Sequence, residues 1–223
     1  MSVKRRAWFG DVYERGVVGQ NRYAITFDDG PLEGATDDIL DILKQHAVPA
    51  TFFVIGQNAA RSPKLIERMA SEGHIIANHT WSHWRLSMFC PSSYWVRELR
   101  RTDEIIHSII GKTPAMFRPP MAVRTPSNSK AMRITGHACV MWTRRAMDGV
   151  ATTKERVLNR LVGGLDDGAV LLLHDGREAA SRRDPRPTIE ALPALLEAAR
   201  DRSLKPTPLD ELLDIAAYRD GAV

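Results

Sequence analysis

The sequence contains little cysteine and no long apolar run. Its two cysteines, Cys90 and Cys139, are too few for a disulfide framework, so we expect buried or unreactive thiols. No stretch approaches the roughly 18 consecutive apolar residues of a membrane-spanning helix. The basic N-terminal segment reaches Gly10-Asp11 before any apolar signal-peptide region forms. These absences predict a protein without a transmembrane segment, and we expect a cytoplasmic location.

Basic residues are not gathered into a run either. The formal net charge is +4, but arginine pairs such as Arg100-Arg101 and Arg144-Arg145 are scattered and indicate solvated faces. Because no recognition motif or aromatic platform accompanies them, the charge gives no support for a nucleic-acid partner. Hydrophobic residues make up 43% of the chain, which is ordinary for a globular protein with a sizeable core. The length of 223 residues suits one large domain or two small ones.

Short apolar runs alternate with amphipathic segments, and neither an internal repeat nor a low-complexity linker separates them. The apolar runs predict strands at Tyr23–Phe27, Ala50–Ile55, Ile75–Ala77, Ala115–Phe117, Ala138–Trp142 and Ala169–Leu173. The segments between them predict helices. Thr36 can be the N-cap of one, another begins at Ser62-Pro63, and others are expected over Pro91–Ile110, after Thr152-Thr153 and over Thr188–Arg202. Because hairpin signals are missing, the alternation favours about six or seven βαβ units, closed or nearly closed into an α/β barrel.

Titratable side chains fall just past five of the predicted strands or at their ends. Asp28-Asp29 follow the first strand, His79 and His83 the third, Arg118–Met121 the fourth and Asp148 the fifth, while His174-Asp175 end the sixth. The carboxyl ends of parallel strands in a barrel meet at one mouth, where such folds gather their functional residues. Turn chemistry alone does not explain this coincidence, so the sequence predicts a functional site at that mouth.

The spacing of His79 and His83 is suited to binding a divalent metal ion. Four residues apart on a helical turn, both imidazoles would lie on one face. A carboxylate from Asp28 or Asp29 would complete a two-histidine, one-carboxylate site with open positions for water and substrate. The other aspartate, left free, could accept a proton from an activated water molecule. Dividing these roles around a cation removes the repulsion between neighbouring carboxylates.

Two further residues could assist hydrolysis at such a site. His174 is a candidate proton donor, because imidazole changes charge near neutral pH. Alternatively, it is a strand-end histidine bonded to the backbone. Arg118 could orient the free aspartate and lower the pKa of that carboxyl group, or it could form an ordinary surface ion pair.

These residues stand in motifs that resemble a known family. In order along the chain, the motifs are TFDDG (Thr26–Gly30), VPATFFVIG (Val48–Gly56), HTWSH (His79–His83), RPP (Arg118–Pro120) and LLLHD (Leu171–Asp175). They are similar to the signatures of polysaccharide deacetylases, the NodB-homology or carbohydrate esterase family four. The resemblance covers roughly residues 23–209 and implies one catalytic domain over 1–223, folded as a deformed (β/α)7 barrel. It implies removal of N-acetyl, sometimes O-acetyl, groups from a carbohydrate or glycolipid by metal-activated water.

The resemblance also implies a role for each matching residue. Asp28 would be the catalytic base, and Asp29, His79 and His83 would bind Zn²⁺ or a related ion such as Co²⁺, Ni²⁺ or Mn²⁺. Arg118 would orient Asp28, and His174, paired with Asp148, would be the general acid. The backbone N–H of Met121 would help to hold the oxyanion. Trp84 and Trp142 are candidate substrate contacts; we expect Trp81 to pack on the rim, whereas Trp84 could either stack on a sugar or pack.

Two departures from the family pattern concern the substrate pocket. Met121 stands where the third motif usually has tyrosine, which removes an aromatic wall. The segment WTRRAMDG keeps Trp142 and Asp148 but has Arg145 at the usual first acidic position and Gly149 in place of tryptophan. Together with Arg144 beside Arg145, these changes predict a wider, more positive acyl pocket, and hence an acidic substrate or a larger acyl group or aglycone. The alternative is that another aromatic side chain refills the wall.

Two other functions are compatible with these motifs. Related barrels open cyclic amides or remove formyl groups, and release of acetate would distinguish a deacetylase from them. A sugar-binding pseudoenzyme would have lost turnover through the altered third and fourth motifs. Binding alone does not require a base, three metal ligands and an acid together, which argues against that reading.

Overall fold

The structure is a computed structural model that describes residues 4–7, 10–178 and 184–220. Its strands are β1 (Lys4–Ala7), β2 (Gly10–Tyr13), β3 (Arg22–Asp28), β4 (Ala50–Val54), β5 (Ile75–Asn78), β6 (Thr113–Pro114), β7 (Met116–Phe117), β8 (Ala138–Cys139), β9 (Arg144–Arg145), β10 (Ala169–His174), β11 (Lys205–Pro206) and β12 (Tyr218–Arg219). Its α-helices are α1 (Ala35–Gln45), α2 (Gly56–Arg61), α3 (Pro63–Ser71), α4 (Ser92–Ile110), α5 (Pro126–Thr135), α6 (Lys154–Val162), α7 (Arg186–Asp201) and α8 (Leu209–Leu213), with 3₁₀ turns η1 (Ser87–Phe89) and η2 (Pro120–Ala122). Within these described ranges, no helix combines the length and apolar character that crossing a bilayer requires.

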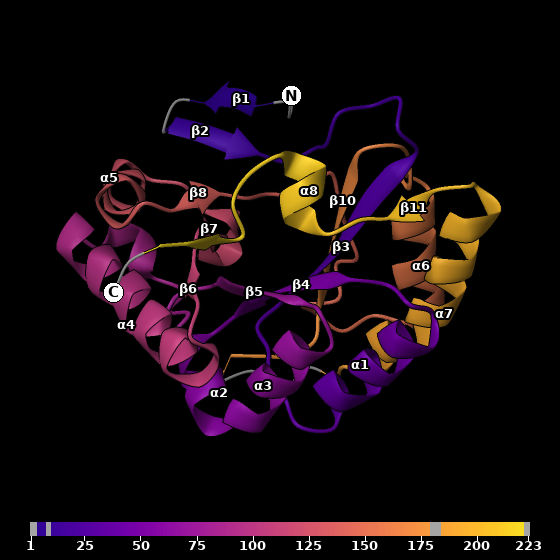
Figure 1. The fold of residues 1–223 in the computed structure, drawn as a ribbon, viewed down its shortest axis with the longest axis horizontal. Helices are drawn as coiled ribbons and strands as arrows, with labels where there is room; N and C mark the ends of the chain where they lie inside the picture. Colours follow the sequence, from indigo (N-terminus) through magenta and orange to yellow (C-terminus); the bar gives the residue numbers. More distant parts are fainter. Residues whose placement is uncertain (1–3, 8–9, 179–183, 221–223) are drawn as a thin grey trace.

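One curled sheet organises the fold. Its strands run in the order β8-β7-β5-β4-β3-β10-β9, and β11 also pairs with β3. Every pairing in this sheet is parallel. Figure 1 shows α4, α3, α1, α7 and α6 arranged around the outside of these strands. The architecture is a deformed (β/α)7 barrel, which confirms the fold class predicted from the alternation and the motifs.

The outward face of the sheet carries the larger part of the core. Side chains alternate between the two faces of a strand, and Tyr23, Ile25 and Phe27 of β3 are buried with apolar residues of the surrounding helices, such as Leu40 of α1 and Leu195 of α7. Each large apolar side chain buried in this way stabilises the fold by roughly 1.5–3 kcal/mol. The apolar stripes of the helices therefore hold the sheet in its curl.

The inward face is apolar at one end of the barrel and polar at the other. Near the start of the strands, Ala24 and Val170 pack in one cluster with Leu209 and Leu212 of α8, which fills the interior. Farther along β3, the same face continues to Asp28 at the carboxyl end. The short helix α8 thus closes one end of the barrel, and the polar groups gather at the other.

Most predicted elements are present with nearly the predicted bounds. Helix α3 begins with Pro63 after the N-cap Ser62, and α4 ends at Gly111 in a left-handed C-cap. Thr153 caps α6 through a hydrogen bond from the N–H of Arg156. The predicted strand at 138–142 is shorter, since β8 contains only Ala138–Cys139.

The predicted cap at Thr36 is wrong. Gly34 is the N-cap of α1, and Thr36 is the second residue of the helix. The Thr36 hydroxyl donates instead to Oδ2 of Asp175 at 2.8 Å and accepts from the N–H of Leu32. The buried carboxylate of Asp175, directly after β10, therefore orients this hydroxyl. The residues next to Thr36 in the sequence give no sign of that contact.

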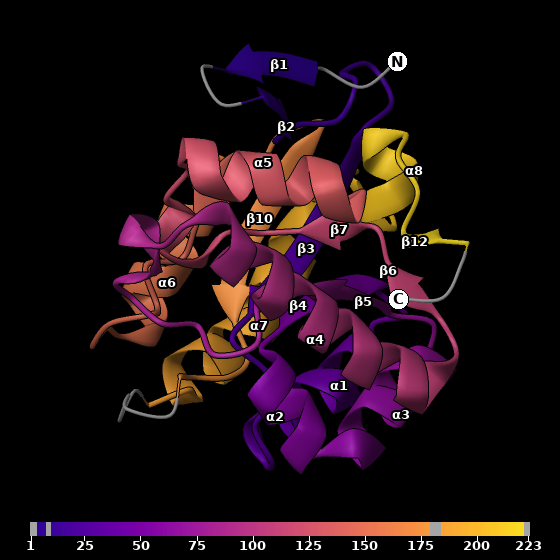
Figure 2. The ribbon, with the colours of Figure 1, turned by 90° about the vertical axis from the view of Figure 1, so that its left-hand side faces the viewer.

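The chain also contains an antiparallel pair that the sequence reading did not predict. Strands β1 and β2 pair outside the main sheet, and Figures 1 and 2 both draw them at the periphery near α5. Tyr13, at the end of β2, forms an isolated parallel bridge to Val140 beyond β8. The expectation of a chain without hairpins is therefore wrong at its N-terminal end.

Candidate active site

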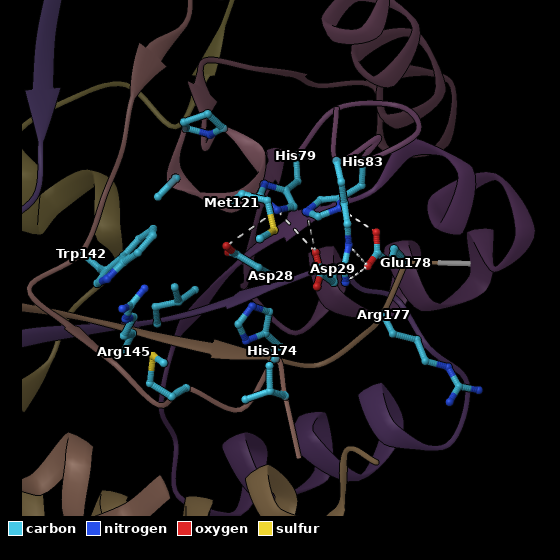
Figure 3. A pocket seen from close by; sticks show the side chains of 17 residues that line it. Asp28, Asp29, His79, His83, Met121, Trp142, Arg145, His174, Arg177 and Glu178 are labelled. Carbon is cyan, nitrogen blue, oxygen red and sulfur yellow. Dashed lines mark hydrogen bonds and ion pairs between the residues drawn. The ribbon is translucent and has the colours of Figure 1, made fainter. Parts of the chain in front are cut away.

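A cavity of about 290 Å³ opens where the carboxyl ends of the strands meet. The predicted site residues that line it are Asp28, Asp29, His79, His83, Met121, Trp142, Arg145, Gly149 and His174. Figure 3 shows Asp28, Asp29 and His174 between Trp142 and Arg145 on one side and Glu178 on the other. Strand register explains part of this convergence, because His174 of β10 is the direct neighbour of Asp28 on β3.

Asp29, His79 and His83 form a compact group of potential metal ligands. Oδ1 of Asp29 lies 3.4 Å from Nε2 of His79 and 3.4 Å from Nε2 of His83. One ligand atom from each residue can be chosen so that all three lie within 4.8 Å of one another. The two imidazoles come from a loop rather than from the expected helical turn. Positive φ angles at Thr80 (70°) and His83 (50°) bend that loop so that the rings converge.

The protonation of these groups suits metal binding. Nδ1 of His79 donates to the carbonyl oxygen of Arg118 at 2.7 Å, since a carbonyl only accepts, and Nε2 is the ring nitrogen that faces Asp29. Burial lowers the pKa of His83, although Asp29 opposes the shift, so that the neutral, metal-binding imidazole is favoured. Burial raises the pKa of Asp29, but contact with His79 and the neighbouring histidine charges outweigh it and hold that pKa below its ordinary value.

The environment of the Asp29 carboxylate tests whether these residues suit a divalent metal ion. Although buried, its Oδ1 makes no hydrogen bond to any described residue. A buried carboxylate oxygen without a partner is costly unless a cation satisfies it. Two neutral imidazoles and one carboxylate are the donor set of zinc and related divalent ions. The residues present therefore fit a divalent metal ion.

Asp28 is held differently from its neighbour. Its Oδ1 accepts from Nη1 of Arg118 at 2.6 Å, and its Oδ2 lies 3.8 Å from Nε2 of His79. Arg118 is fully buried, stacks on the ring of Phe53 and donates further bonds to Thr26 Oγ1 and to backbone carbonyl groups. The guanidinium group therefore fixes one oxygen of Asp28 and leaves the other facing the ligand group.

His174 is tied to Asp148 as well as to the cavity. Its Nδ1 lies 2.7 Å from Oδ1 of Asp148, whose Oδ2 accepts from the backbone N–H of His174 and from the hydroxyl of Thr188. Burial alone would lower the pKa of His174, but the Asp148 carboxylate outweighs burial and raises that pKa to about 9. Because Nδ1 faces Asp148, Nε2 is the other ring nitrogen of a side chain that lines the cavity.

The aromatic residues are placed unequally. Trp142 lines the cavity and lies over Arg118, at 5.5 Å from guanidinium carbon to ring centroid. Trp84 is half exposed and does not line the cavity; its ring contacts Tyr94 edge-on. Trp81 carries the guanidinium of Arg101 at 3.7 Å from its ring centroid, so it packs on the rim as predicted. Met121 has a left-handed backbone (φ 55°) and an exposed side chain at the cavity.

Glu178 is a cavity residue that sequence reasoning missed. Its Oε2 lies 3.5 Å from Nδ1 of His83, and its Oε1 accepts from Nε of Arg85 at 2.6 Å. It stands four residues beyond His174, outside the regular strand, and no local pattern distinguishes it from a solvated glutamate. Only the fold brings it against the second imidazole.

Comparison with known proteins agrees with the geometry. A family profile described as polysaccharide deacetylase matches residues 15–140. A chitooligosaccharide deacetylase of Bradyrhizobium sp. (strain ANU 289) is 35% identical over 202 residues, which cover 88% of this chain and 92% of that protein. The chain belongs to the polysaccharide deacetylase family.

Solved structures of this family share the architecture. The Bc1960 peptidoglycan N-acetylglucosamine deacetylase, in complex with a hydroxamate-type benzamide, matches with a TM-score of 0.87 and 28% identity over 93% of this chain and 95% of that one. A family pseudoenzyme from Bacillus anthracis, BA3943, matches with a TM-score of 0.82 at 21% identity, over 96% of this chain and 72% of that one. The second likeness concerns the fold alone, so turnover has to be argued from the site residues.

Proposed function

We propose that this chain is a single catalytic domain, a metal-dependent hydrolase that removes N-acetyl groups from an amino-sugar carbohydrate. The observation that supports it most is the division of labour between adjacent aspartates. Oδ1 of Asp29 faces two imidazoles and makes no hydrogen bond to a described residue, whereas Asp28 accepts a hydrogen bond from a buried arginine. The names of the family relatives, which act on chitooligosaccharide and peptidoglycan, support the same chemistry.

In this proposal the metal ligands are Asp29, His79 and His83. A divalent cation bound there supplies Lewis acidity, which lowers the pKa of a water molecule and polarises the acyl oxygen. Zinc suits the donor set best. Two contacts orient the imidazole rings for metal binding. The Nδ1–H of His79 donates to the Arg118 carbonyl, and the Glu178 carboxylate lies beside His83.

The remaining residues divide the proton transfers. Asp28 is positioned by Arg118 and accepts a proton from the attacking water molecule while the water oxygen bonds to the acyl carbon. The backbone N–H of Met121 donates to the developing oxyanion. The imidazolium of His174 donates its Nε2 proton to the leaving nitrogen as the C–N bond breaks. The products are acetate and a free amino sugar, with no covalent acyl-enzyme.

The direct test is acetate release from N-acetylglucosamine oligomers. We expect the metal-loaded protein to release one acetate per new amine, and a chelator to stop the reaction until metal is restored. Formate release, or opening of a cyclic amide in preference, would indicate a related amide hydrolase on the same barrel. Binding of the oligomer without any metal-dependent release would indicate a pseudoenzyme and overturn the proposal.

The Asp148–His174 pair gives a prediction about pH. A general acid must be protonated, so the rate is expected to fall as pH rises through the His174 pKa, raised by Asp148 to about 9. In Asp148→Asn the carboxylate is removed, and the basic limb of the kcat profile should move to lower pH by about one unit or more. The matched control is Asp201→Asn at the end of α7, which should leave the profile in place. An unchanged limb in Asp148→Asn would exclude His174 as the titrating acid.

Glu178 gives a prediction about metal affinity. Its carboxylate orients His83, and loss of such an outer partner typically weakens metal binding by about 10- to 100-fold. Glu178→Ala is therefore expected to raise the Kd for Zn²⁺ by about tenfold or more, measured by competition with a chromophoric chelator. Glu104→Ala, an exposed change on α4, serves as the control. An affinity of Glu178→Ala within about twofold of wild type would show that the carboxylate does not support the ligand.

A further inference from the structure

Most acidic groups at the cavity face a positively charged partner. Asp28 faces Arg118, Asp148 faces His174, and Glu178 faces Arg85. Asp29 faces His79 and His83, and the metal ion of the proposed function would balance its charge. The guanidinium of Arg145 lines the same cavity but forms no hydrogen bond or ion pair in the part of the chain that the structure describes. Among the described residues that line the cavity, Arg145 is thus a positive group without a partner.

Strand register directs this arginine into the cavity. Arg145 of β9 pairs with Leu172 of β10, and Leu172 lies two residues before His174 on the same face of the strand. Leu172 and His174 both line the cavity. Arg144, its neighbour, faces the other way and fills the space beside Gly164 at the end of α6. The two arginines that the sequence presents as a pair therefore have different environments.

The missing side chain at Gly149 leaves room beside His174 in the same cavity. Gly149 stands beside the acid, and a Cβ added there would lie 3.5 Å from Cε1 of His174. A side chain at that position would therefore contact the imidazole. Figure 3 draws Arg145 with Trp142 on the side of Asp28 opposite His83 and Glu178. The two-residue offset between Leu172 and His174 corresponds to about 7 Å along the strand, so a group bound by Arg145 is close to the reacting amide.

We propose that the substrate is an acidic N-acylated saccharide and that Arg145 binds its carboxylate. The inference rests on the proposed hydrolysis of an amide at this site. A guanidinium group recognises a carboxylate through parallel, charge-assisted hydrogen bonds, and an uncompensated one at a cavity favours an anionic ligand. Two sources supply that carboxylate near the amide: a neighbouring sugar that carries an acid group, or an acyl chain that ends in one.

The test compares three substrates by the rate of amine release from the metal-loaded protein. They are a neutral N-acetylglucosamine oligomer, an oligomer of the same length in which a uronic acid residue adjoins the N-acetylglucosamine, and an N-succinylglucosamine oligomer. We expect kcat/KM for one of the two acidic substrates to exceed the neutral value by about 10- to 100-fold, the scale of hydrogen bonds to a charged group. Which of the two is preferred identifies the source of the carboxylate.

Variants assign that preference to Arg145. In Arg145→Gln the ratio of acidic to neutral kcat/KM should fall to near one, and Arg145→Lys should keep part of it. Arg144→Gln removes the same charge from the opposite face and should leave the ratio unchanged. Thermal unfolding of each variant establishes that it is folded. A wild-type enzyme that hydrolyses the neutral oligomer at least as well, or a ratio unaffected in Arg145→Gln, overturns the inference and leaves the hydrolase intact. No amine release from any substrate overturns the hydrolase, and the inference with it.

Discussion

Asp28→Asn is expected to abolish hydrolysis while metal content stays near the wild-type level. Asparagine can still accept the hydrogen bond from Arg118 but cannot take up a proton, so the rate should fall by about 10²- to 10⁴-fold. The ligand group of Asp29, His79 and His83 is untouched by the change. Turnover of an acetylated oligomer and metal content by mass spectrometry, measured on the same preparation, give the two numbers needed.

Controls for this variant follow from the burial of Arg118. Removing the charge of its partner leaves a buried guanidinium without a counter-ion, and breaking such a pair typically costs about 3–5 kcal/mol of stability. Assays therefore belong well below the unfolding temperature of the variant. Asp29→Asn is the mirror control, because it should lose the metal together with activity. Loss of metal from Asp28→Asn, with retention by Asp29→Asn, would reverse the assignment of the two aspartates.

His79→Ala should lose both metal and activity. Its Nε2 faces the Asp29 carboxylate, and the hydrogen bond from its Nδ1 to the Arg118 carbonyl fixes the ring, so the alanine variant lacks an oriented ligand nitrogen. Two remaining protein ligands are fewer than the three that catalytic zinc sites use. We expect stoichiometric Zn²⁺ in the wild type and almost none in the variant, with activity at background. His107→Ala, on the exposed face of α4, should retain both.

Recovery of activity by excess metal would refine this result. Partial rescue of His79→Ala at high Zn²⁺ concentration is expected, because His83 and Asp29 remain in place. Full metal content in His79→Ala under ordinary dialysis would contradict the ligand assignment. It would place the ion elsewhere on the chain.

The positions of the main site residues could be predicted because they depend on parallel-strand geometry. Asp28 and His174 end neighbouring strands in register, so their proximity follows from the fold alone. The pairing of His174 with Asp148 also agrees with the motif alignment, and Asp148 lies in the loop after β9. The family profile, the curated relative and the solved structures confirm the family that the motifs indicated.

Other features depend on contacts between distant parts of the chain, and local patterns could not reveal them. The i, i+4 spacing of His79 and His83 suggested a helical turn, but positive φ angles in a loop bring the rings together. Thr36 looked like a helix cap until Asp175, far along the chain, supplied a buried acceptor. Glu178 lies beside His83 only because of the path that the chain takes after β10. Such tertiary contacts override local preference without leaving a periodic signal.

The adjacent arginines of β9 illustrate the same limit on a smaller scale. Sequence alone placed Arg144 and Arg145 together on a solvated face, and also joined them in the argument for a positive pocket. The register with β10 separates them, and only Arg145 lines the cavity. Two-residue periodicity in a strand is simple, but the strand itself is only two residues long and could not be recognised from its composition.

Diffraction from crystals of the zinc-loaded protein, recorded at the zinc absorption edge, would test the central claim most directly. We predict a single anomalous peak in each molecule's cavity, bonded to Nε2 of His79, to Nε2 of His83 and to the carboxylate of Asp29. Asp28 should remain on Arg118 without bonding to the ion. A peak bound by Asp28 in place of Asp29, or a cavity without a peak in protein that turns over substrate, would contradict the account.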